Sequence, residues 1–158
     1  MKFVIATLAA LAVADQSDFP KDDSFHADCH VSAQFDGMSC DSVYTLVDAE
    51  VRRWGSSTTS PAGGEYQLYE ESSDSYIWSK RLTKDEKYTD DQMFDFVETN
   101  AGCNVTGHSR SESMSVYDYS VNFCNLWNVY NGVGSPFTYS VGVCGYPADD
   151  PVTTCARY

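Results

Sequence analysis

The sequence predicts an α+β fold in which an antiparallel sheet of about five or six strands carries two helices on one face. Three observations predict it. Two segments space their apolar residues as helices do, several others alternate at the period of a strand, and six cysteines follow an apolar N-terminal run. We therefore expect a single domain that is stapled by disulfides.

The N-terminus has the features of a secretory signal peptide. Met1 and Lys2 precede an apolar run that ends in the small-residue pattern A-V-A at position 14. We expect residues 1–14 to be removed, residues 15–28 to form an irregular acidic tail, and residues 29–158 to form the domain. The predicted location is extracellular, or the lumen of a secretory compartment.

The cysteines indicate three disulfides. An even number of cysteines behind a signal peptide is typical of an oxidising compartment, and no C-x-x-C or close Cys/His spacing suggests a zinc site. Spacing alone does not choose the pairing. The six residues are Cys29, Cys40, Cys103, Cys124, Cys144 and Cys155.

The strongly negative net charge of the chain disfavours anionic partners. The formal net charge is −13, which disfavours phosphate backbones and anionic membrane surfaces, so we expect no nucleic acid partner. Beyond the signal peptide, no segment approaches the roughly 18 apolar residues of a membrane span, and we expect no membrane insertion. Asn104 begins the sequon Asn-Val-Thr and is a candidate glycosylation site.

Two histidines are weak candidates for metal binding. His26 and His30 are four residues apart with Asp28 between them. In a loop, such pairs are usually solvated side chains, so we expect neither a metal nor another cofactor.

The first predicted helix covers residues 39–54. Ser39 or Asp41 can serve as its N-cap, and Gly55 ends it. Its apolar stripe consists of Val43, Val47, Val51 and Trp54. Such a stripe predicts a helix packed on a sheet.

The second predicted helix covers residues 120–130. Ser120 can cap it, and Asn131-Gly132 ends it. The residues expected on its apolar face are Phe123, Leu126, Trp127 and Tyr130.

Five segments have the composition and alternation of strands: 66–70, 76–82, 93–97, 103–116 and 137–143. Asp90 and Asp91 are expected to precede the third, and a turn at 100–102 joins it to the fourth. We expect the C-terminal tail, residues 145–158, to be held by a disulfide rather than by hydrogen-bonded secondary structure.

The fourth strand carries a row of serines. With a period of two, one face is small and hydroxylic, and the other is larger and mixed. The first face consists of Val105, Gly107, Ser109, Ser111, Ser113 and Ser115; the second consists of Thr106, His108, Arg110, Glu112, Met114 and Val116.

Short motifs in this region resemble the core of the DUF-fourteen-ninety-nine family, bacterial and plastid domains without an established function. The resemblance covers about residues 40–128. It departs from the family pattern at Val116-Tyr117-Asp118, where a glycine is missing, and at 123–125, where a basic run is missing. The matching residues are Asp90, Asp91, Phe94, Phe96, Ser109, Arg110, Ser111, Ser113, Asp118, Val121 and Asn122.

We expect a secreted binding or structural module whose partner is a small molecule, a glycan or a protein. Three tryptophans and eleven tyrosines suit a core and also a carbohydrate face. The candidate ligand-binding residues are Asp91, Ser109, Ser111, Ser113, Asp118 and Asn122. A pocket lined by the serine row would favour a ligand site, whereas a helix lying flat on the row would favour packing.

The alternative is a small secreted hydrolase that uses region 108–122. His108, Ser111 and Asp118 supply the residue types of a catalytic triad. However, no nucleophile-elbow motif surrounds any serine, and His108 and Ser111 point to opposite faces of one strand.

Overall fold

The computed structural model describes residues 15–72 and 75–158, so the predicted signal peptide lies outside the described residues. Three α-helices and six strands make up this part of the chain. The helices are α1 (Cys40–Arg53), α2 (Val121–Gly132) and α3 (Pro151–Cys155). The strands are β1 (Asp28–Asp36), β2 (Glu65–Ser72), β3 (Tyr76–Leu82), β4 (Thr89–Thr99), β5 (Gly102–Ser111) and β6 (Thr138–Cys144).

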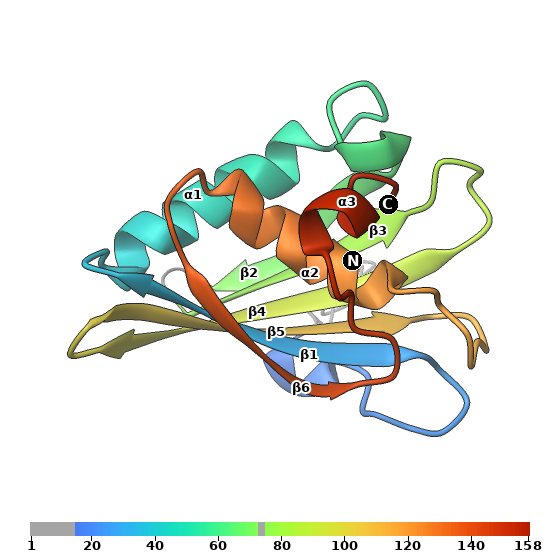
Figure 1. Cartoon of the computed structure of the whole chain (residues 1–158), viewed down its shortest axis with the longest axis horizontal. Coiled ribbons are helices and arrows are strands. Elements are labelled where there is room, and N and C mark those ends of the chain that lie inside the picture. The colour runs from blue at the N-terminus through green and yellow to red at the C-terminus, as the bar shows by residue number, and fades with distance from the viewer. Residues whose placement is uncertain (1–14, 73–74) are drawn as a thin grey trace, which may run out of the picture.

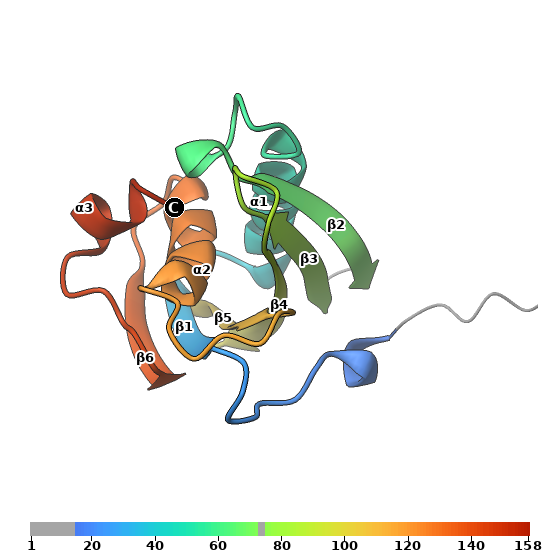
Figure 2. The same cartoon turned by 90° about the vertical axis from the view of Figure 1, so that its right-hand side faces the viewer.

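The strands form one antiparallel sheet in the order β2-β3-β4-β5-β1-β6. Successive hairpins join β2 to β5, and β1 fills the place between β5 and β6. All three helices lie on the same side of the sheet (Figure 1; Figure 2). The predicted α+β class, with its antiparallel sheet, is confirmed.

Strand β1 is not among the five predicted segments. Its Val31, Ala33 and Phe35 alternate toward the helices and are fully buried, so the period-two pattern is present. Small and polar residues alternate with them, which weakens the local strand signal. Pairing with β5 on one side and β6 on the other therefore decides the conformation of this segment.

The first helix forms as predicted. Ser39 is its N-cap, and the Ser39 hydroxyl accepts a hydrogen bond from the backbone N–H of Ser42 at 3.3 Å. The predicted stripe faces the sheet and is buried: Val43, Val47, Val51 and Trp54.

The second helix is buried more completely than its sequence predicts. Every residue from Asn122 to Tyr130 is buried, because α2 lies between the sheet, α1 and α3. The expected N-cap is wrong: Ser120 has a φ of 75° and makes no capping hydrogen bond through its side chain. Asp118 caps the helix instead, since its Oδ2 accepts from the backbone N–H of Asn122 at 2.9 Å.

The C-terminal tail contains α3, which contradicts the expectation of no hydrogen-bonded secondary structure. Asp150 is the N-cap, accepting from the backbone N–H of Thr153 at 3.2 Å, and Pro151 occupies the first turn. This Asp-Pro pair is a helix-start signal. Asn128 of α2 also donates to the carbonyl oxygens of Cys155 and Tyr158 at 3.2 and 2.9 Å.

Three disulfides connect the elements, as predicted. Each joins residues distant in the sequence: Cys29–Cys144 links β1 to β6, Cys40–Cys103 links α1 to β5, and Cys124–Cys155 links α2 to α3. All six cysteines lie within the described ranges, and none is free.

We therefore expect no thiol to react with an alkylating reagent in the native protein. The measurement is intact mass after alkylation, first under native conditions and then after reduction and unfolding. Mass should be added only in the second case, at six sites. Alkylation of any cysteine in the native protein would contradict the three bridges.

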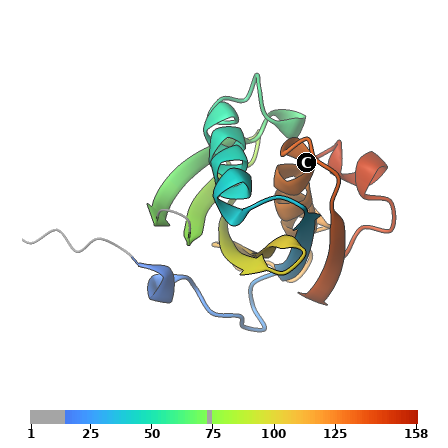
Figure 3. The ribbon, with the colours of Figure 1, turned by 90° about the vertical axis from the view of Figure 1, so that its left-hand side faces the viewer.

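The N-terminal segment, residues 15–27, crosses the face of the sheet opposite the helices (Figure 2; Figure 3). It is irregular apart from a short 3-10 turn at Gln16–Asp18. Phe19 packs against Trp78 with ring centroids 5.2 Å apart, and Asp23 pairs with Arg110 at 2.6 Å. The acidic tail is thus docked on the sheet.

Within residues 15–72 and 75–158, none of the helices has the length and apolar character needed to cross a bilayer.

Candidate ligand pocket at the start of α2

Strand β5 places its serines beneath the second helix. Gly107 makes the close approach possible, because a Cβ there would lie 2.1 Å from the Tyr130 hydroxyl oxygen. The Tyr130 hydroxyl donates a hydrogen bond to the Val31 carbonyl oxygen at 2.8 Å, and this bond connects α2 to the sheet. The strand ends at Ser111, so the predicted continuation of the serine row to Ser113 and Ser115 is wrong.

Asn122 is the centre of a buried polar layer between α2 and the sheet. Its Oδ1 accepts from the Ser109 hydroxyl at 2.8 Å. The two N–H groups of its Nδ2 are shared among three acceptors: Asp118 at 2.9 Å, the Ala27 carbonyl oxygen at 3.0 Å and the Ser111 hydroxyl at 3.2 Å. One fully buried side chain therefore joins the helix start to β5 and to the N-terminal segment.

Asp90 of β4 extends this layer. Its two carboxylate oxygens accept from Ser111 and from Asn125, at 2.8 and 2.9 Å. Burial raises the pKa of Asp90, and the hydrogen bonds from Asn125 and Ser111 oppose that shift. The layer thus holds a carboxyl group that would be costly to bury without such partners.

The polar layer opens into a pocket at the N-terminal end of α2, with a volume of about 260 Å³. Asp90, Ser111 and Asp118 line it from the polar layer. We call it the α2 pocket, and its lining residues are Thr83, Tyr88, Asp90, Ser111, Met114, Ser115, Tyr117, Asp118, Tyr119 and Val121.

The rim of the α2 pocket carries large side chains that are exposed to solvent. Tyr88, Met114, Tyr117 and Tyr119 are 53, 76, 67 and 71% exposed. Tyr119 also has a φ of 53°, a left-handed conformation that bulky residues rarely adopt, and it is followed by a second residue with positive φ. Strained backbone of this kind is common at ligand sites, and here it presents an aromatic ring to solvent.

The two charged groups of the pocket, Asp90 and Asp118, are carboxylates that only accept hydrogen bonds. The hydroxyl protons of Thr83, Ser111 and Ser115 are donated within the protein. Each oxygen of Asp90 accepts one hydrogen bond from the protein, and a carboxylate oxygen can accept two. Asp118 Oδ1 accepts only a long bond, 3.3 Å, from the backbone N–H of Ser120. The remaining capacity suits a ligand that donates O–H or N–H groups and offers an apolar face to the tyrosines.

The structure divides the predicted ligand-binding residues. Ser111 and Asp118 line the pocket. Ser109 lies beneath α2 and hydrogen-bonds Asn122, which belongs to the first turn of that helix, and both are buried outside the pocket. Asp91 lies on the opposite face of the sheet, where it accepts from Trp78 Nε1 at 2.8 Å. Ser113 is exposed and outside the pocket.

Asp90 and the rim residues are not among the site residues predicted from the sequence. Adjacent acidic residues point to opposite faces of a strand, so only the register of β4 shows that Asp90 faces the helices. The alternation Tyr117-Asp118-Tyr119 next to a helix start was an available signal for the rim.

The residues of the predicted triad are not brought together. His108 lies on the face opposite Ser111, where its Nε2 is 2.9 Å from Asp22 Oδ1. Ser111 instead donates to Asp90. The opposite orientation expected for His108 and Ser111 is therefore observed, and this geometry does not assemble a Ser-His-Asp nucleophile.

Two other predicted sites also lie on the face opposite the helices. Asn104 is half-buried on β5 and donates through Nδ2 to the Ala33 carbonyl oxygen at 3.4 Å. His26 pairs with Asp23 at 2.9 Å, whereas His30 contacts Asp22. The two histidines proposed as a pair thus have separate partners.

No family model and no curated protein matches this sequence. Among solved structures, the chain is similar to protein CV1439 from Chromobacterium violaceum, a structural genomics target. The two sequences are 8% identical, the match covers 69% of this chain and 94% of that chain, and the TM-score is 0.44. This similarity carries no argument about function, and the resemblance to the DUF-fourteen-ninety-nine family stays a hypothesis.

Proposed function

We propose that this chain is a secreted binding module that holds a neutral glycan in the α2 pocket. The observation that carries the proposal is the group of exposed tyrosines, Tyr88, Tyr117 and Tyr119, around a pocket whose charged groups are both carboxylates. Aromatic rings pack against the C–H faces of sugars, and carboxylates accept hydrogen bonds from sugar hydroxyls.

Charge and size support this ligand class. The net charge of −13 and the two carboxylates of the pocket oppose an anionic ligand. A volume of about 260 Å³ is near the lower end for small-molecule sites and suits one or two sugar rings. The three disulfides agree with secretion, because such bonds persist in oxidising compartments.

The test is a screen of the purified, disulfide-bonded protein against neutral, anionic and amino-sugar glycans, with choline as a competing cationic probe. We expect a neutral glycan to bind. The double variant Tyr117→Ala, Tyr119→Ala should bind it about tenfold more weakly, since each ring contact contributes about 0.5–1.5 kcal/mol. Its melting temperature should not change, because both side chains are exposed.

Tyr69→Ala is the matched control. This tyrosine is also about half exposed but lies on β2, outside the pocket. Its loss should leave glycan affinity unchanged. Binding of choline without any glycan would contradict the proposal, as would equal weakening by Tyr69→Ala and the double variant.

A further inference from the structure

The face of the sheet opposite the helices brings two histidines into register. His30 of β1 and His108 of β5 are directly paired across adjacent antiparallel strands, so their side chains emerge on the same face. Their rings stack with centroids 3.9 Å apart. No other pair among the three histidines of the chain lies on neighbouring strands in this way.

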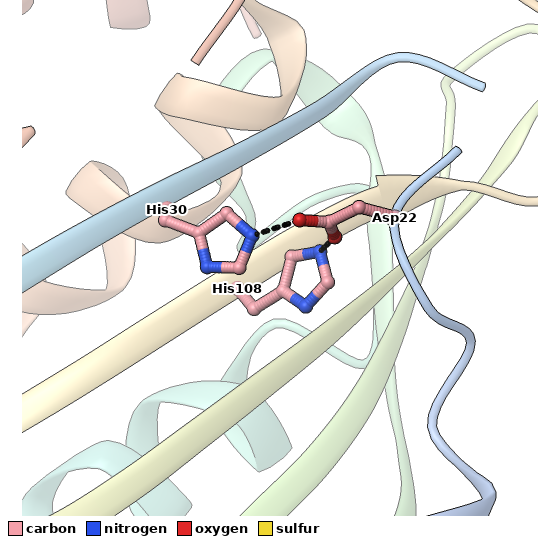
Figure 4. Close-up of side chains that lie close together, drawn as sticks. All are labelled: Asp22, His30 and His108. Carbon is pink, nitrogen blue, oxygen red and sulfur yellow. Dashed lines mark hydrogen bonds and ion pairs between the residues drawn. The ribbon is translucent and has the colours of Figure 1, made fainter. Parts of the chain in front are cut away.

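The docked N-terminal segment adds a carboxylate to this pair. Asp22 Oδ2 lies 3.0 Å from His30 Nε2, and Asp22 Oδ1 lies 2.9 Å from His108 Nε2 (Figure 4). The three ligand atoms, one from each residue, all lie within 4.8 Å of one another. In a tetrahedral zinc site with bonds of about 2.0 Å, ligand atoms are roughly 3.3 Å apart, so little movement is needed.

One atom of the cluster lacks a hydrogen bond. His108 Nε2 is buried, and despite its short distance to Asp22 it makes no hydrogen bond within the described chain. A buried polar atom without a partner is unusual and calls for an explanation. This nitrogen lies close to Asp22 and beside His30, which is where a shared cation would be held (Figure 4).

The surroundings of the cluster suit a cation with one coordination position open to water. Phe19 packs against the His108 ring, with centroids 4.8 Å apart, and covers one side of the cluster. The nearby cation Arg110 is paired with Asp23 at 2.6 Å, and Asp28 lies opposite Arg110 in the strand register. Asp22 is partly exposed, so water can complete the coordination.

We propose that Asp22, His30 and His108 form a binding site for a divalent transition metal such as Zn²⁺. Two imidazole nitrogens and one carboxylate oxygen are the donors that zinc and its neighbours prefer, whereas Ca²⁺ and Mg²⁺ prefer oxygen alone. A metal held there joins the N-terminal segment to β1 and β5.

The experiment titrates the disulfide-bonded protein with zinc chloride against a chromogenic chelator, in millimolar Mg²⁺ to occupy exposed carboxylates. We expect one tightly bound Zn²⁺ per chain. Replacing Zn²⁺ by Co²⁺ should give the strong visible absorption of a four-coordinate site. His30→Gln and His108→Gln should each weaken Zn²⁺ binding at least about tenfold.

His26→Gln is the matched control, because His26 is the remaining histidine and contacts Asp23 instead. It should leave Zn²⁺ affinity unchanged. If His108→Gln does not fold, Asp22→Asn on the surface segment removes the third ligand without altering the sheet. The proposal is overturned if Zn²⁺ binds without a defined stoichiometry, or if His26→Gln weakens binding as much as His30→Gln.

Discussion

Val47→Asp should unfold the domain. Val47 is fully buried in the middle of α1, in the stripe that packs on the sheet. A carboxylate there has no partner, and an unpaired buried charge costs several kcal/mol. We expect a loss of more than about 4 kcal/mol, a large share of the stability of a domain of this size. Near-ultraviolet circular dichroism and denaturant unfolding measure the effect.

Ala49→Asp is the control for the same charge in the same helix. Ala49 is exposed, and Arg52 and Arg53 lie one turn away. The change in the free energy of unfolding should stay below about 1 kcal/mol. Equal destabilisation by the two variants would refute the orientation of α1.

Asn122→Ala should cause the second largest effect. The side chain has four hydrogen-bond partners in the buried polar layer, and its loss leaves the Ser109 hydroxyl and the Asp118 carboxylate with fewer partners. Each unsatisfied buried group costs about 1–3 kcal/mol. We expect a total of about 3–5 kcal/mol and a melting temperature at least about 6 °C lower.

The matched control is Asn131→Ala, which removes an exposed asparagine from the same helix. Its effect should be within about 0.5 kcal/mol. If Asn122→Ala melts at the same temperature as the parent protein, the polar layer is not structural support. Its residues would then belong with the ligand site, where polar groups are often held at a cost to the fold.

The Asn122 and tyrosine variants test two different parts of the region around the start of α2. The layer under α2, centred on Asn122, is predicted to hold the helix on the sheet. The rim formed by Tyr88, Met114, Tyr117 and Tyr119 is predicted to contact ligand without contributing to stability. From the sequence alone, a pocket lined by the serine row and a helix packed on that row are alternatives. The structure contains both, because the serine row runs from beneath α2 at Ser109 to the pocket at Ser111.

Local patterns predicted the elements whose own residues specify them. The stripe of α1 from Val43 to Trp54 and the alternation of β5 are short-range signals that depend on 3.6- and 2-residue periods. A local signal also exists for α3, because an N-capping Asp150 followed by Pro151 favours a helix start.

The sequence by itself determined the α+β class, the even set of cysteines and the opposite orientations of His108 and Ser111, because periodicity and composition act locally. Only the tertiary structure decided the disulfide pairing, the place of β1 in the sheet, and the meeting of Asp22, His30 and His108. These depend on contacts between residues far apart in the chain. Strand order and register bring such residues together, and local patterns in a single sequence specify neither the order nor the register.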